Sequence, residues 1–264
     1  MGRILNGIDL TLDRPIRQDR KDVPRASYNG IVGGLIRTIS DGAEIPPLNM
    51  PAALYLPGYP GQGTVIRDYS GNGNHGAITG ATWVRLPSGA WVNNIDADDR
   101  IAIADAASLD ITGDLTLEAW VYLNSATGSH YPINKWDTNT NDKAYMLYIT
   151  GTPNAPNFVL RNAADSGETN LAAATSLLAS TWYHLVAVHS GGTMYQYING
   201  AQDVNTGAIG AGRASANQVW LGNYAPGTTA GLNGRQGGIA IYNRALSLAE
   251  VQQRFNQIRH LYGV

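Results

Sequence analysis

Residues 115–121 read Leu-Thr-Leu-Glu-Ala-Trp-Val, and this stretch decides the fold class. Its odd-numbered positions are all apolar, whereas Glu118 and Trp120 stand at even-numbered positions. Successive side chains of an extended strand point to opposite faces, so the pattern predicts a strand with one face in an apolar core. We expect Glu118 to be a buried, hydrogen-bonded structural residue.

Similar short runs recur along the rest of the chain from Pro51, bounded by Gly, Asn, Asp and Pro. This spacing is typical of a β-sandwich or jelly roll. The Asn199-Gly200 pair between two extended runs predicts a hairpin, because both central residues of a type I′ turn take positive φ. The clearest predicted strands are residues 100–104, 115–123, 144–149, 157–161, 182–189, 193–198, 218–222 and 238–242.

The composition supports the same class and excludes several functions. The 264 residues include 31 Gly, 12 Pro and no Cys, so disulfides, thiol nucleophiles and cysteine zinc sites are excluded. Only 14% of residues are charged, against about 25% in ordinary soluble domains, which suits a lectin-like or assembled protein. The net charge of -2 argues against a nucleic-acid partner, and no run approaches the roughly 18 apolar residues of a membrane span.

The two ends of the chain differ from its middle. Residues 247–262 predict a helix, because Ser247 and Glu250 form a capping box ahead of apolar residues at helical spacing. Residues 1–50 lack sustained periodicity and predict an extended anchoring or inter-subunit arm, with 51–264 as the sandwich domain. A flexible tail is the alternative, and residues 8–12 could add a strand to a sheet edge. Basic residues expected to face a partner are Arg14, Arg17, Arg20, Lys21 and Arg25.

Four stretches together resemble the LamG-like family of concanavalin A-like jelly rolls. They are residues 68–76 (DYSGNGNHG), 115–121 (LTLEAWV), 182–188 (WYHLVAV) leading to 197–200 (YING), and 241–247 (IYNRALS). Their order and spacing match the family over about residues 51–255. The resemblance implies an all-β, antiparallel sandwich with one concave sheet and ligand loops at its rim.

Family members often bind calcium through acidic loop residues, and the resemblance implies Asp68, Asp98 and Asp99 as candidates. Calcium takes six to eight hard oxygen ligands, which carboxylates and loop carbonyls supply. Two observations weigh against it. Asp68 can instead cap a tight turn, and Gly237-Gly238 stand where the family commonly has an acidic pair.

The residues do not form a recognisable catalytic set. Glycoside hydrolysis on this architecture needs two carboxylates about 5 to 5.5 Å apart for retention. Glu118 has no acidic neighbour at positions 116, 120 or 122, and Glu168 and His130 are expected in loops. No G-x-S-x-G, H-E-x-x-H or P-loop motif is present. We therefore expect a protein that is not an enzyme.

Sugar binding needs flat rings that stack on sugar C–H faces beside planar polar groups. Most Trp residues lie in predicted strands and suit core packing. Trp136 differs, because it opens the polar run 136–142 (WDTNTND), which predicts a loop with an exposed indole. The candidate carbohydrate-binding residues are Trp136, Asp137, Asn139 and Tyr224.

The leading interpretation is a virion structural protein, such as a phage capsid decoration protein, held to capsid proteins by its arm and assembled in the host cytoplasm. The family usually works outside cells, residues 1–23 do not resemble a secretion signal, and a virion leaves by lysis. A homo-oligomer is expected, with glycan binding as an added capacity. The alternative is a secreted carbohydrate-binding or adhesion module, and an intracellular scaffold is a third possibility.

Overall fold

The computed structural model describes residues 4–5, 8–9, 50–59, 61–96, 98–137, 139–224 and 231–264. The chain divides into two units, Met1–Gly34 and Leu35–Val264. In the first unit, β1 (Ile4–Leu5) pairs antiparallel with β2 (Ile8–Asp9). The predicted arm otherwise lies outside the described residues up to residue 49, so its role stays a prediction. The same holds for its basic residues Arg14, Arg17, Arg20, Lys21 and Arg25.

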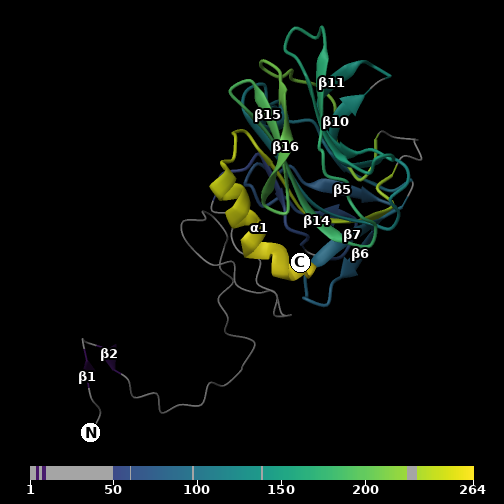
Figure 1. Ribbon diagram of the computed structural model, residues 1–264. Coiled ribbons are helices and arrows are strands. Elements are labelled where there is room, and N and C mark those ends of the chain that lie inside the picture. Colours follow the sequence, from purple (N-terminus) through teal and green to yellow (C-terminus); the bar gives the residue numbers. More distant parts are fainter. Residues whose placement is uncertain are drawn as a thin grey trace. The chain divides into compact units, whose positions relative to one another are not determined.

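The second unit is a sandwich of two antiparallel sheets, as predicted (Figure 1). The front sheet runs in the order β13 (Glu168–Ala172), β12 (Pro156–Arg161), β11 (Asp142–Ile149), β10 (His130–Asp137), β17 (Val219–Leu221), β8 (Arg100–Ile103), β5 (Gly76–Thr79) and β4 (Val65–Ile66). The back sheet runs in the order β16 (Ala201–Ala208), β15 (Thr193–Ile198), β14 (Trp182–Ser190), β9 (Leu115–Leu123), β18 (Gly234–Tyr242), β7 (Trp91–Ile95) and β6 (Thr82–Arg85). Strand β3 (Leu54–Leu56) pairs with β18, and a short 3-10 helix covers Ala107–Leu109.

The main hydrophobic core lies between the sheets and follows from the alternation along each strand. Leu115, Leu117, Ala119 and Val121, the odd-numbered positions of β9, are all in this core, as predicted. Burial of such side chains stabilises the sandwich by about 25 cal/mol for each Å² of apolar surface removed from water. At the predicted hairpin, Asn199 and Gly200 have φ of 53° and 77°, which confirms the turn between β15 and β16.

Helix α1 (Leu248–Tyr262) confirms the C-terminal prediction and packs on the outer face of the back sheet (Figure 1). The capping box is present: Glu250 N donates to the Ser247 hydroxyl, and the Glu250 carboxylate accepts from Ser247 N. The helix covers Trp120, whose ring stacks on Tyr262 with centroids 4.1 Å apart. A second hydrophobic core therefore lies between helix and sheet. No helix in the described ranges is long and apolar enough to cross a membrane.

The Gly237-Gly238 pair has a packing role beneath this helix. At Gly238, where φ is +55°, a Cβ atom would lie 2.9 Å from both the Trp120 ring and the Tyr262 hydroxyl. The pairing of β18 with β9 shifts register between Gly237 and Ala240. Larger residues at this bulge would force the stacked rings apart, which explains why glycines stand here.

A buried ion pair joins the helix to the centre of the back sheet. The Arg254 guanidinium donates through Nε to both Glu118 carboxylate oxygens, at 3.2 and 3.3 Å. Tyr242 donates its hydroxyl to the same carboxylate at 2.7 Å, and His184 Nε2 lies 3.0 Å from it. Burial alone would raise the pKa of Glu118, but Arg254 and these hydrogen bonds outweigh it and lower the pKa to about 2. Glu118 is therefore a buried, hydrogen-bonded structural residue, as the sequence predicts, and it is charged.

The edge strands β13 and β16, one from each sheet, are joined by side chains. Thr169 donates its hydroxyl to Ala208 O at 3.1 Å, and Asn205 donates its amide to Ala172 O at 3.0 Å. Asp203, itself buried, accepts from the backbone amides of Ala174 and Thr175 beyond β13. These bonds close one side of the sandwich.

Replacing Arg254 by Met is expected to destabilise the protein by about 3 to 5 kcal/mol, because the Glu118 carboxylate would stay buried without its cation. Urea unfolding followed by circular dichroism measures the change. Arg259→Met is the matched control, since Arg259 is exposed on the same helix, with its guanidinium over the Phe255 ring. Equal midpoints for the two variants would contradict the role assigned to Arg254.

Candidate functional site

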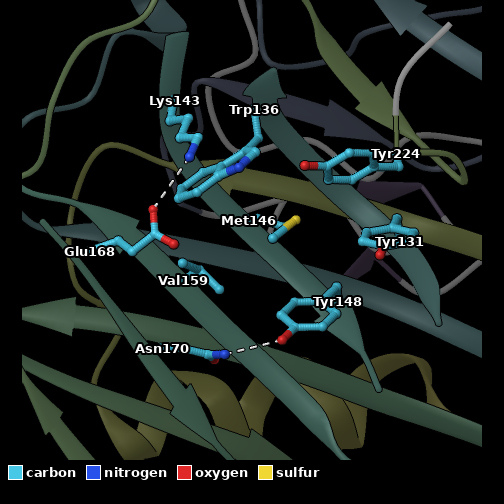
Figure 2. Close-up of a pocket in the computed structure, with 9 residues that line it drawn as sticks. All are labelled: Tyr131, Trp136, Lys143, Met146, Tyr148, Val159, Glu168, Asn170 and Tyr224. Carbon is cyan, nitrogen blue, oxygen red and sulfur yellow. Dashed lines mark hydrogen bonds and ion pairs between the residues drawn. The ribbon is translucent and has the colours of Figure 1, made fainter. Parts of the chain in front are cut away.

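An open pocket of about 260 Å³ lies on the outer face of the front sheet (Figure 2). Along β11, Tyr145, Leu147 and Ile149 point into the main core, so Met146 and Tyr148 point to the opposite face. Cross-strand pairing places Met146 next to Val159 and Val159 next to Asn170. The pocket floor is thus one row of side chains across three strands. Its volume is close to the lower end of the range of about 300–1,000 Å³ for ligand pockets.

Three half-buried tyrosines form one side of the pocket. The Tyr131 and Tyr148 rings are stacked, with centroids 5.7 Å apart and planes 13° apart. The Tyr224 ring is tilted against Tyr131 at 4.9 Å. A tyrosine hydroxyl is protonated at neutral pH, and burial raises the pKa of Tyr131 further. These rings offer flat apolar faces with hydroxyl groups at their edges.

Trp136 lies in the same pocket but not in the predicted loop. It belongs to strand β10 and is only 3% exposed, so the expectation of an exposed indole is wrong. Strand β10 includes the first two residues of the polar run, Trp136 and Asp137. The ammonium of the preceding residue, Lys135, is buried 2.5 Å from Asp105 and 3.1 Å from Asp110. The next side chain, that of Trp136, faces the outer side of the sheet and packs against Met146 and Val159.

The opposite end of the pocket is polar. The Lys143 ammonium lies 5.2 Å from the centroid of the Trp136 ring and 3.7 Å from Glu168 Oε2 (Figure 2). Asn170 donates its amide to the Tyr148 hydroxyl at 3.0 Å. Glu168 and Asn170 are both exposed and come from β13, so the sequence-based placement of Glu168 in a loop is wrong. This end offers hydrogen-bond donors and acceptors beside the rings.

Of the four predicted carbohydrate-binding residues, the structure brings two together. Trp136 and Tyr224 both line the pocket. Asp137, the last residue of β10, and Asn139, in the turn that follows, are outside the lining, and the Asp137 carboxylate accepts from Asn139 N at 2.7 Å. Sequence reasoning missed Tyr131, Lys143, Met146, Tyr148, Glu168 and Asn170. Four of these residues stand at i, i+2 spacing, Met146 and Tyr148 on β11 and Glu168 and Asn170 on β13. This spacing was the sequence signal that could have placed each pair on one sheet face.

The calcium candidates do not fit a metal site. Asp68 Oδ1 accepts from Tyr55 N and Ser70 N, both at 2.9 Å, and Oδ2 accepts from the Ser70 hydroxyl and Asn74 N. The carboxylate thus caps a turn, which was the alternative interpretation. Asp98 is exposed, and Asp99 accepts from Asp96 N across a short turn. Within the described residues no three His, Cys, Asp or Glu side chains cluster as metal ligands.

Comparisons with known proteins agree with this architecture. The Laminin_G_3 family profile, described as the Concanavalin A-like lectin/glucanases superfamily, matches residues 95–252, more than half of the chain. A comparison with curated proteins found no match.

Several solved structures are similar in fold. The binding domain of Paraclostridial Mosquitocidal Protein 1 has a TM-score of 0.63 and 18% identity, over 81% of this chain and 55% of that chain. A structure of botulinum neurotoxin type C has a TM-score of 0.58 and 14% identity, over 78% and 50%. The binding domain of botulinum neurotoxin DC in complex with SialylT has a TM-score of 0.58 and 12% identity, over 79% and 52%. The chain spans about half the length of these structures.

Replacing Trp136 by Ala is expected to lower the stability by about 3 kcal/mol or more, because truncating a buried indole leaves a cavity. Differential scanning calorimetry and urea unfolding measure the change. Tyr224→Ala is the control within the same pocket and should cost less, since this ring is only partly buried. A Trp136→Ala protein as stable as Tyr224→Ala would show that the indole contributes no packing.

Proposed function

Because the chain belongs to the Concanavalin A-like lectin/glucanases superfamily, we propose that it is a non-enzymatic carbohydrate-binding protein whose sugar site is the front-sheet pocket. The observation that carries the proposal is the set of half-exposed tyrosine rings beside exposed polar groups. Tyr131, Tyr148 and Tyr224 offer faces for sugar C–H groups. Glu168 and Asn170 offer planar hydrogen-bonding groups at the adjacent edge.

The carboxylates support binding without hydrolysis. A glycoside hydrolase commonly uses two carboxylates that flank the scissile bond. Glu168 is the one acidic residue that lines the pocket among the described residues. Glu118, the carboxylate in the central back-sheet strand, is fully buried beneath α1 and held by Arg254, so no substrate reaches it. Among the described residues, neither therefore has a second carboxylate across a shared, accessible site.

The similar structures lend support of a general kind. Botulinum neurotoxin type C depends upon interaction with two ganglioside molecules to enter cells, and the DC binding domain was solved in complex with SialylT. Their identity to this chain is 12% to 14%, so their ligands are not transferred to it. The shared property that supports our proposal is their role as binding domains on this fold.

The proposal extends to a place in a larger assembly. We propose that residues 1–50 are an arm that attaches the sandwich of residues 51–264 to capsid or other virion proteins, as in a phage decoration protein that forms homo-oligomers. The low share of charged residues, 14%, and the clustering of basic residues between Arg14 and Arg25 motivate this proposal. Its localisation would then be the virion, assembled in the host cytoplasm.

A secreted adhesion or carbohydrate-binding module is the second candidate, and the pocket favours it equally. Both candidates use the same sugar site and differ in what the first 50 residues contact. Genes for capsid, portal or terminase proteins beside this gene would favour the virion, whereas polysaccharide-utilisation genes would favour the secreted module.

Replacing Tyr148 by Ala is expected to weaken glycan binding about fivefold or more, because each lost stacking face contributes about 1 kcal/mol or more. Glycan arrays followed by isothermal titration of the best ligand measure the effect. Tyr195→Ala is the matched control, since Tyr195 is a partly buried tyrosine on the back sheet. Equal losses in both variants, or binding unaffected by Tyr148→Ala, would place the sugar elsewhere.

Removing residues 1–50 is expected to leave the sandwich folded, because among the described residues the buried members of both hydrophobic cores lie between Ala53 and Tyr262. Thermal unfolding should change only slightly, while co-sedimentation with particles that lack the protein should be lost. Attachment of residues 51–264 as strong as that of the full chain would contradict the arm as anchor. Unfolding of the shortened chain would show that the arm belongs to the domain.

A further inference from the structure

The polar end of the pocket holds a cation and an anion that neutralise each other. The Lys143 ammonium and the Glu168 carboxylate both line the pocket, 3.7 Å apart (Figure 2). The Lys143 side chain is only 16% exposed, whereas that of Glu168 is 42% exposed. A ligand at this end therefore contacts the carboxylate more readily than the ammonium.

Further ion pairs extend from Glu168 to basic and acidic side chains outside the pocket. Arg161 Nη1 lies 3.3 Å from Glu168 Oε2, and Arg161 Nε lies 2.8 Å from Asp165. Arg213 then joins Asp165 at 3.8 Å to Asp142 at 3.1 Å. Three basic and three acidic side chains alternate in this chain of contacts. Its summed charge is zero, so the pocket edge presents no excess of either sign.

We propose that the pocket binds an uncharged sugar residue and discriminates against sugars that carry a carboxylate or sulfate, with Glu168 as the specificity-determining residue. This inference rests on the proposed carbohydrate-binding function. A sugar hydroxyl can donate to Glu168 and accept from Lys143 without disturbing their pairing. A ligand carboxylate only accepts hydrogen bonds, and to reach Lys143 it must approach Glu168 as a like charge.

The discrimination against acidic sugars follows from the position of Glu168 in the pocket rather than from the net charge of the protein. The protein as a whole has a formal charge of -2, too small to repel acidic glycans over distances beyond about 8 to 10 Å in physiological salt. Repulsion therefore has to act inside the pocket, at contact distance from Glu168. Removing that one negative charge leaves Lys143 without its partner and turns the same pocket end into a site for anions.

The test measures binding of the full chain to neutral oligosaccharides, each paired with a counterpart that carries one sialic or uronic acid. Isothermal titration at low salt should show the acidic member of a pair binding at least about tenfold more weakly. Glu168→Gln keeps the shape of the side chain and should raise affinity for the acidic member at least about tenfold, with a new dependence on salt. Adding Lys143→Met to Glu168→Gln should remove that gain.

Asp165→Asn is the matched control, because it removes the same charge from the same chain of contacts without lining the pocket. An equal gain for acidic sugars in Asp165→Asn would overturn the assignment to Glu168. Equal binding of both members of each pair by the unaltered protein would overturn the inference and leave the sugar site intact. Binding of no oligosaccharide in the panel would overturn the proposed function and the inference together.

Discussion

The contact between Glu118 and Arg254 determines which of the two sheets the helix covers. A charged carboxylate at the centre of β9 is stable there because the helix supplies a guanidinium at 3.2 Å, and Tyr242 and His184 add hydrogen bonds. The same contact holds α1 against the back sheet, where Trp120 and Tyr262 stack between them. This helix covers the back sheet's outer face, and the outer face of the front sheet, over β10 to β13, carries the pocket. The pocket therefore lies on the sheet that the helix leaves uncovered.

The fold could be predicted largely from local patterns. Alternation along residues 115–123 and 193–198 predicts β9 and β15 with the bounds that the structure has, and the capping box at Ser247 predicts α1. These features depend on neighbours in the sequence. The strand β10 was missed because its polar residues are satisfied by distant partners, as when Asp105 and Asp110 pair with Lys135. No pattern in the neighbouring sequence indicates a partner that lies so far away along the chain.

The candidate site was less predictable for the same reason. Trp136 and Tyr224 could be singled out as aromatic residues in polar surroundings, yet the pocket depends on the register of β11, β12 and β13. That register sets Met146 beside Val159 and Val159 beside Asn170. It also places Glu168 within 3.7 Å of Lys143, two residues that are 25 positions apart in the chain. Cross-strand pairing of this kind is specified by the whole sandwich rather than by any one segment.

The side-chain hydrogen bonds that join β13 to β16 affect whether neighbouring copies can pair through this sheet edge. A sheet edge with free amides and carbonyls can template pairing with another chain and lead to aggregation. Here Thr169 and Asn205 occupy edge carbonyls, and the inward-facing Asp203 occupies amides just beyond β13. Many copies can therefore stand close together without adding strands to one another along this side. Because β13 also carries Glu168 and Asn170, the same bonds that cap this edge hold a strand that lines the pocket.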